Sequence, residues 1–240
     1  MLPPRDYDEA ITIFSPDGRL YQVEYAMEMV NRGAPIVGVF SPEGVVLAAN
    51  ETPASSLEES DLSRKIFQLD DHMGAAISGL FSDARVLIER ARLICQWNRL
   101  HYDEVIDAEP LVMRVGDLLQ VYTQYAGVRP FGVSMIVAGV DHSGCRILTT
   151  DPTGNYRGYF AVAMGQRSGE TNKMLEEHYR DDLTLDEATA LAIEAVKSAS
   201  KGEVTSDGVK VAVIPAETRI FRRLTEMEIE KHLSRFTPKD

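Results

Sequence analysis

The sequence predicts an α+β protein in which two antiparallel sheets stack face to face and helix pairs cover both outer faces. Three observations lead to this prediction. The expected strands come in clusters rather than alternating singly with helices, which argues against a parallel βαβ sheet. Two pairs of short apolar runs flank turn-forming residues, as in β-hairpins. Two pairs of amphipathic helices separate the strand clusters, and each helix has an apolar face to bury.

The first half of the chain is expected to hold a turn, a helix, two hairpins and two helices. The turn is Ser15-Pro16-Asp17-Gly18, with proline at its second position and Asp-Gly at its exit. Apolar residues then recur at helical spacing from Leu20 to Val30, and Gly33 can close that helix. The hairpin strands are expected at 36–40, 45–49, 66–69 and 73–78, and the two helices are marked by apolar residues at 84–98 and 111–122.

The second half repeats the order of strands followed by two helices. Strands are expected at 133–140, 146–149 and 159–164, helices at 168–179 and 185–200, and further strands at 209–215 and 219–221. Thr184 with Glu187, and Thr225 with Glu228, form capping boxes that mark two helix starts. Neither an internal repeat nor a dividing linker is visible, so residues 12–240 are predicted to form a single domain.

Composition excludes several classes of function. The chain has 240 residues and a formal net charge of −12, which disfavours nucleic acids and anionic membranes by repulsion. Its two cysteines, Cys95 and Cys145, suggest a reducing compartment. The polar N-terminus does not resemble a signal peptide, and no apolar run approaches the roughly 20 residues of a membrane helix. We therefore expect a cytoplasmic protein that binds neither nucleic acid nor membrane.

A search for catalytic and metal-binding motifs finds no match. The five histidines are too far apart in sequence for a local metal pair, and phosphate-binding and dinucleotide-binding glycine motifs are missing. Gly132-Val133-Ser134 begins like a nucleophile elbow, but Ile136 replaces the second glycine. The acidic groups lack the alternating spacing of a calcium-binding loop. No cofactor and no metal are expected.

One long segment carries a resemblance to a known family. The string YDEAITIFSPDGRLYQVEYA at residues 7–26 resembles the N-terminal signature of proteasome α subunits. Residues 65–70, 78–85, 122–125 and 129–134 are similar to archaeal members of that family, and the resemblance covers roughly residues 7–235. It implies a four-layer αββα sandwich, the N-terminal nucleophile hydrolase fold, which agrees with the order of the elements.

The family has a catalytic β branch and an α branch, and two positions separate them here. The β branch uses an N-terminal threonine that its own amine helps to activate. The corresponding strand begins Gly33-Ala34, which offers no nucleophile, and the acidic partner is replaced by Asn50. Lys65 resembles one of the catalytic residues of the β branch, but a lysine alone cannot catalyse the hydrolysis. The resemblance therefore implies a subunit without catalytic residues of its own.

The α branch implies a gate at the N-terminus. In the family, α subunits form a heptameric ring at each end of a barrel, and their N-terminal segments block the axial pore. Residues 1–11 are expected to be this mobile gate segment. Tyr7, Asp8, Pro16 and Tyr25 resemble the cluster that holds the gate open.

The resemblance also implies a pocket and a set of partners. Lys65 resembles the lysine that binds the C-terminal carboxylate of an activator, with Gly18, Gly33 and Leu80 lining the same pocket. The expected partners are further α chains in a homomeric or heteromeric ring, β-type subunits, a proteasome-activating ATPase, and unfolded proteins in transit. The helix at 20–30 is expected to pack between neighbouring subunits.

Two alternatives stay open at this point. A hydrolase of the same fold would need a threonine, serine or cysteine freed at the N-terminus, and Gly33-Ala34 offers none. An adaptor that borrowed the fold would form a small oligomer rather than a ring. The chain departs from its relatives at Ala34-Pro35, at Glu51-Thr52-Pro53 and at Pro3-Pro4, and the last leaves the closed-gate geometry open.

Overall fold

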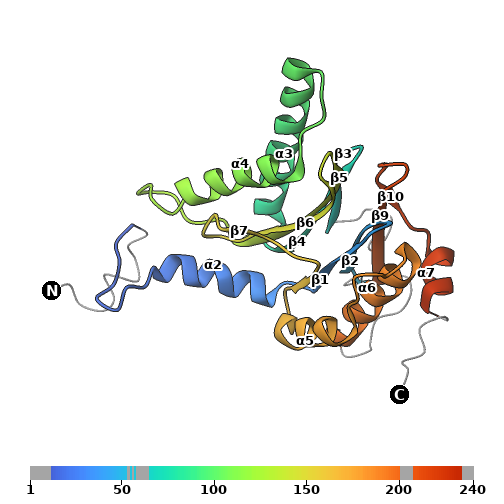
Figure 1. Ribbon diagram of the computed structural model, residues 1–240. Helices are drawn as coiled ribbons and strands as arrows, with labels where there is room; N and C mark the ends of the chain where they lie inside the picture. The colour runs from blue at the N-terminus through green and yellow to red at the C-terminus, as the bar shows by residue number, and fades with distance from the viewer. Residues whose placement is uncertain (1–11, 53–54, 56, 58–64, 201–207, 234–240) are drawn as a thin grey trace.

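The computed structural model describes residues 12–52, 55, 57, 65–200 and 208–233. Within these ranges the chain forms two five-stranded antiparallel sheets, with strand orders β10-β9-β2-β1-β8 and β3-β4-β5-β6-β7. Figure 1 shows the layers: α3 and α4 cover one sheet, and α5, α6 and α7 cover the other. The predicted four-layer αββα sandwich is confirmed.

The elements follow one another as the sequence predicts, with two exceptions. In the first half they are α2 (Tyr21–Arg32), β1 (Ile36–Ser41), β2 (Gly44–Asn50), β3 (Ile66–Asp70), β4 (Met73–Gly79), α3 (Phe81–Tyr102) and α4 (Ala108–Val121). In the second half they are β5 (Val133–Asp141), β6 (Gly144–Thr150), β7 (Tyr156–Gly158), β8 (Ala161–Met164), α5 (Ser168–His178), α6 (Leu185–Ala199), β9 (Val209–Pro215), β10 (Arg222–Arg223) and α7 (Glu226–Leu233).

Three apolar clusters fill the spaces between the four layers. One lies between α3, α4 and the sheet of β4 and β5, a second between α5, α6 and the sheet of β1 and β2, and a third between the two sheets. Strands that are buried on both faces need apolar residues at every position. This explains why β1 and β2 read as continuous apolar runs, as in Val45, Val46 and Leu47.

The two exceptions concern strands near turns. The strand expected at 159–164 is shorter, because only β8, Ala161–Met164, is a strand, and it pairs with β1. The strand β7, Tyr156–Gly158, pairs with β6 in the other sheet and was not predicted. Tyr159 and Phe160 cross between the sheets, and because aromatic residues favour strands, their sequence does not reveal the crossing. The short strand expected at 219–221 lies instead at 222–223, because Arg219 adopts a positive φ of 54° that interrupts an extended backbone.

Helix α2 stands apart from the two helix layers. In Figure 1 it extends to the left from the start of β1, and residues 12–20 lie at its outer end. Its buried residues are Val23, Ala26 and Val30, which face β4 and β5. Gly33 follows the helix in an extended conformation, with φ −64° and ψ 149°, and its N–H donates to the Val30 carbonyl at 2.9 Å, so α2 ends at Gly33 as predicted.

No helix within the described ranges is long and apolar enough to cross a membrane. The predicted gate segment, residues 1–11, and the far C-terminus, residues 234–240, lie outside the described residues.

Candidate functional site

The predicted site residues on α2 and its flanks are spread along the whole helix. Pro16 and Gly18 precede the helix, Gly33 follows it, and Tyr25 lies between them with half of its surface exposed. A helix of 12 residues is about 18 Å long at about 1.5 Å per residue. Gly18 and Gly33 of one chain therefore cannot line one small pocket. Tyr7 and Asp8 lie outside the described residues.

The turn before α2 is held by hydrogen bonds among its own residues. Gly18 N–H donates to the Ser15 carbonyl at 2.8 Å, which confirms the predicted β-turn with Pro16 in its second position. Ser15 N–H donates to the Arg19 carbonyl at 2.9 Å, and Arg19 N–H donates to Ser15 Oγ at 3.1 Å. Gly18 has φ +75°, a conformation that glycine adopts without steric cost.

An ion pair joins this turn to the first turns of α2. Arg19 Nε donates to Glu24 Oε1 at 2.7 Å, and its guanidinium lies 5.0 Å from the ring centroid of Tyr21. The hydrogen bonds from Arg19 lower the pKa of Glu24 and raise the pKa of Arg19. Sequence reasoning missed this pair, although the five-residue spacing at a helix start was the available signal.

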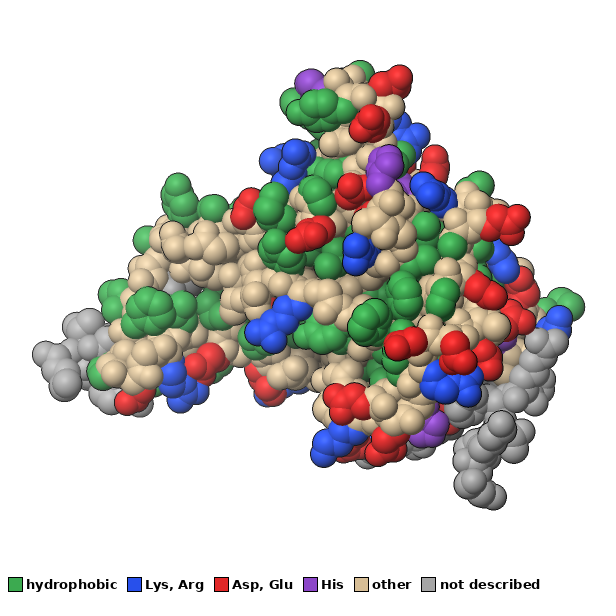
Figure 2. Space-filling model, viewed as in Figure 1, with side chains coloured by type: hydrophobic (Ala, Val, Ile, Leu, Met, Phe, Trp, Pro, Cys, Tyr) green, Lys and Arg blue, Asp and Glu red, His purple; other side chains and the backbone are tan. Residues whose placement is uncertain are grey.

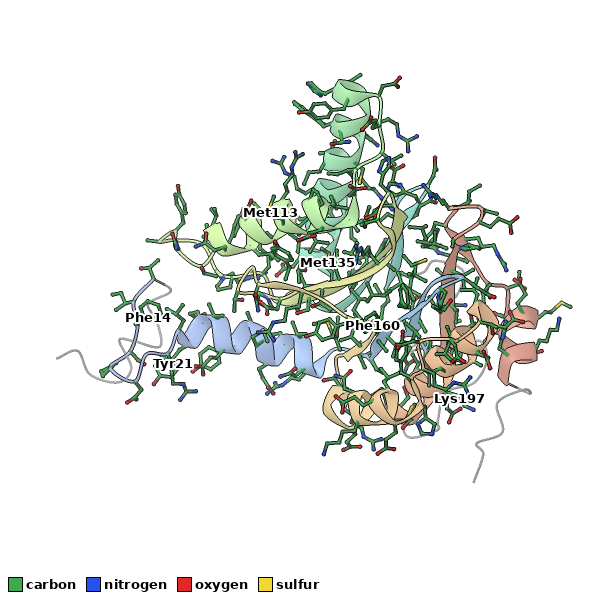
Figure 3. All side chains as sticks on the ribbon, in the orientation of Figure 1. Phe14, Tyr21, Met113, Met135, Phe160 and Lys197 are labelled. Atoms are coloured by element: carbon green, nitrogen blue, oxygen red, sulfur yellow. The ribbon has the colours of Figure 1, made fainter. Side chains whose placement is uncertain are left out.

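The outer end of α2 carries exposed apolar side chains. Phe14 and Ile13 are 65% and 46% exposed, and Tyr25, further along the helix, is 50% exposed. Figure 3 labels Phe14 and Tyr21 at this end, and Figure 2 shows hydrophobic side chains on the same part of the surface. Aromatic side chains gathered on a projecting element are typical of a protein contact surface.

At its inner end α2 meets the end of β4 in close backbone packing. A Cβ on Gly33 would stand 2.4 Å from Ser78 Oγ and 2.6 Å from Gly79 N, so the space beside this glycine is already filled by the same chain. Ser78 Oγ donates to the Val30 carbonyl at 3.1 Å. Internal packing is therefore sufficient to require glycine at position 33.

Lys65 lies beside the same end of β4. Its Nζ is 3.4 Å from the Ile77 carbonyl, and its backbone carbonyl accepts from Ile77 N–H at 2.9 Å. Burial lowers the pKa of this lysine, and the negative charge of Glu51 partly opposes the shift. Glu51 Oε1 also accepts from Lys65 N–H at 2.9 Å. Glu51, noted in the sequence as a departure from the family, thus anchors the start of β3.

Leu80 completes this group from the other side. It directly follows β4, is half-buried, and its N–H donates to the Gly132 carbonyl at 2.9 Å. The structure therefore brings Lys65, Gly33 and Leu80 to one end of β4, and it leaves Gly18 at the far end of α2. We name this group, Lys65, Gly33 and Leu80, the β4 site.

Sequence reasoning missed a salt bridge between Arg129 and Asp83, which lies next to the β4 site. Arg129 Nη1 and Nη2 donate to Asp83 Oδ2 and Oδ1 at 2.6 and 2.8 Å, and Gly132 N–H donates to Oδ2 at 2.9 Å. These hydrogen bonds, led by those from Arg129, lower the pKa of Asp83. Both residues occur in the segments 78–85 and 129–134 that carry the family resemblance, which was the signal available.

The position that a nucleophile would occupy in this fold holds Ala34, whose side chain carries no nucleophilic atom. Ala34 follows Gly33, whose carbonyl accepts from Gln166 N–H at 2.8 Å. Asn50 Nδ2 donates to Ser200 Oγ at 2.8 Å, just after the end of α6, so this side chain serves a contact between β2 and α6. Among the described residues, no group of three or more His, Cys, Asp or Glu could hold a metal ion.

Comparison with known proteins agrees with this geometry. Residues 30–214 match the family model of the proteasome subunit, and residues 7–28 match the model of the N-terminal signature of A-type proteasome subunits. The chain is 48% identical to the proteasome alpha subunit of Methanothermobacter thermautotrophicus over 95% of this chain and 92% of that protein. It is 50% identical to the proteasome alpha 1 subunit of Haloferax volcanii over 95% of this chain and 90% of that protein. It is also 48% identical to the proteasome alpha subunit of Methanopyrus kandleri, over 95% and 92%.

Proposed function

Because this chain belongs to the proteasome subunit family, in its α-type branch, we propose that it is a non-catalytic member of the outer heptameric ring of a proteasome core particle. One observation carries the proposal. The signature segment and α2 are joined through Gly33 and Ala34 to β1, which begins at Ile36, so the chain has an alanine where the β branch has its nucleophile. Proteolysis would then belong to β-type subunits stacked beneath this ring, in a cytoplasmic particle.

The exposed side of α2 supports assembly with neighbouring copies. Val23, Ala26 and Val30 bury one face of the helix on its own chain, while Tyr25 and Met29 leave a second apolar face exposed. A helix with apolar residues on two faces has a second surface to cover. In the ring this face would pack against the adjacent copy, together with Ile13 and Phe14.

A gate at the N-terminus follows from the same arrangement. Residues 1–11 would crowd the axial pore, and Tyr7 and Asp8 would contact Tyr25 of a neighbour when the pore opens. Pro16 belongs to a turn held within residues 15–19, so this turn can shift on α2 without disturbing the sandwich. Unfolded proteins would pass through the opened ring.

The β4 site would bind the C-terminal carboxylate of an activating ATPase. Lys65 offers a partly desolvated ammonium group, and the negative charge of Glu51 compensates for that desolvation only in part. A terminal carboxylate would pair with this ammonium and so compensate for the hydration that burial has partly removed. Gly18 would join this pocket only from the adjacent copy, since about 18 Å of helix separates it from Gly33 of its own chain.

The Lys65→Ala variant tests the pocket. Removing the ammonium should abolish stimulation of peptide hydrolysis by an activating ATPase, while rings still assemble and unstimulated hydrolysis stays the same. The measurement is hydrolysis of a fluorogenic peptide by assembled core particles with and without the ATPase. Unchanged stimulation would refute the pocket role of Lys65.

A native mass spectrum tests the function as a whole. The purified chain is measured alone and with a β-type partner, and full-length chains in rings of seven, with hydrolysis only when the partner is present, are expected. A monomer or dimer even with the partner would favour an adaptor. A chain trimmed near Gly33 that hydrolyses peptides alone would favour a hydrolase of the same fold.

A further inference from the structure

An ion pair near the β4 site joins the buried carboxylate of Asp83 to the exposed guanidinium of Arg129. We propose that Asp83 is a positioning residue for the activator pocket: with Arg129 it fixes the backbone of Gly132, which in turn fixes Leu80. This inference rests on the proposed function of the β4 site. It concerns a residue that does not itself contact the activator.

The carboxylate uses both of its oxygens on groups distant in the chain. Arg129 donates to Oδ1 and Oδ2 across 46 residues, and Gly132 N–H donates to Oδ2 across 49 residues. Asp83 is only 7% exposed, whereas the Arg129 side chain is 59% exposed. Of the three hydrogen bonds, the one from Gly132 N–H is therefore the best shielded from water. Two parallel bonds from one guanidinium also fix its direction as well as its distance.

The role of Asp83 is not chiefly that of a helix cap. It lies in the first turn of α3, where an acidic side chain often accepts from the free N–H groups of the helix. Its carboxylate is bound instead by Arg129 and Gly132, which belong to the segment leading into β5. These hydrogen bonds therefore connect the start of α3 to the segment that precedes β5, next to Leu80, which follows β4.

Gly132 passes this constraint to the pocket. Its carbonyl accepts from Leu80 N–H at 2.9 Å, and a Cβ on Gly132 would stand 3.0 Å from Leu80 Cδ1 and 3.5 Å from Met29 Cβ. A Cβ on Gly79 would stand 2.2 Å from the Gly132 carbonyl. With so little space, a displacement of Gly132 must move Leu80 relative to α2, and thereby one of the residues of the β4 site.

The test measures binding of one peptide to assembled core particles built from the full chain and its β-type partner. The probe is a fluorescently labelled peptide with the C-terminal sequence of a proteasome-activating ATPase and a free carboxylate, followed by anisotropy. The variants are D83N, R129K and K65A. The control is E89Q, which removes a carboxylate from the exposed Arg85–Glu89 pair on the same helix.

The expected result separates positioning from folding. D83N should raise the Kd of the peptide about 10-fold, the effect of one lost charged hydrogen bond, with unchanged stoichiometry and ring yield. R129K should raise it less, because lysine keeps the charge but cannot donate two parallel bonds. Amide hydrogen exchange at Leu80 should become faster in D83N and remain as in the wild type in E89Q.

Each other outcome overturns a distinct statement. If K65A weakens binding and D83N does not, Asp83 has no positioning role although the pocket stands. If neither variant weakens binding, the pocket itself is wrong. If D83N weakens binding only together with lost rings or reduced stoichiometry, Asp83 serves folding alone and the inference fails.

Discussion

The two ends of α2 are built in opposite ways. At the outer end, Ser15, Gly18 and Arg19 bond to one another, and Arg19 reaches no further than Glu24. At the inner end, Gly33 lies against Ser78 and Gly79, from a strand more than forty residues away. One end is therefore held by local contacts and the other by long-range contacts.

This difference assigns distinct tasks to the two ends. A turn held only by its own residues can change its direction at little cost to the core, because no long-range packing has to be rebuilt. A junction whose glycines touch backbone has no free space and can move only as a unit. The outer end thus suits a gate that shifts, and the inner end suits a pocket that keeps its shape.

Substituting one glycine at the inner end of α2 should cause the largest loss in the free energy of unfolding. In Gly79→Ala, the new Cβ would stand 2.2 Å from the Gly132 carbonyl, at a backbone φ of +115° that side chains rarely adopt. Overpacking and backbone strain together should destabilise the chain by about 3 kcal/mol or more. The measurement is the urea midpoint followed by circular dichroism, together with the yield of soluble protein.

The same substitution at the outer end provides the matched control. Gly18 also has a positive φ, but no described atom lies within 4 Å of the place where its Cβ would stand. Gly18→Ala should therefore lower the free energy of unfolding by only about 1 kcal/mol, the cost of a left-handed conformation. Equal losses at both ends would mean that backbone strain alone, and not packing, distinguishes them.

Most of the fold could be predicted because it depends on local patterns. The hairpin turns, the apolar faces of the helices and the capping box of α6, where Thr184 and Glu187 bond reciprocally, are all visible within a few residues. The strand β7 was missed and β8 was predicted to start two residues early, because the sequence of 156–164 does not show that the chain passes from one sheet to the other at 159–160. Sheet membership is set by partners far away in sequence.

The candidate site also combines features that local sequence patterns predict with features that depend on residues far apart in the sequence. The turn at Pro16 depends on neighbouring residues alone, so sequence reasoning could locate it. To predict that Gly18 and Gly33 lie far apart, one needs the length and direction of α2, which only the structure gives. The salt bridge between Asp83 and Arg129 joins positions 46 residues apart, and a single sequence contains no pattern that pairs them.

The charge of Asp83 gives a smaller and more specific prediction. Its pKa is held below the ordinary value, chiefly because Arg129 donates hydrogen bonds to the carboxylate and also because Gly132 N–H does. The folded state therefore binds this proton less readily than the unfolded state, whose aspartate titrates near a pKa of about 3.9. The stabilisation is fully present above that value and is lost as the pH falls through the lower, folded pKa.

Comparing the wild type with Asp83→Asn isolates this contribution. The free energy of unfolding should differ by about 2 kcal/mol at neutral pH, the range for a hydrogen bond to a charged group, and the difference should narrow below about pH 4. Other carboxylates with lowered pKa values, such as Glu228 with a pKa of about 2, titrate in both proteins and cancel in the difference. The measurement is urea unfolding at a series of pH values. Curves that stay parallel down to the acid limit would show that the pKa of Asp83 is the same in the folded and unfolded states, so that its hydrogen bonds to Arg129 and Gly132 add no charge-dependent stability.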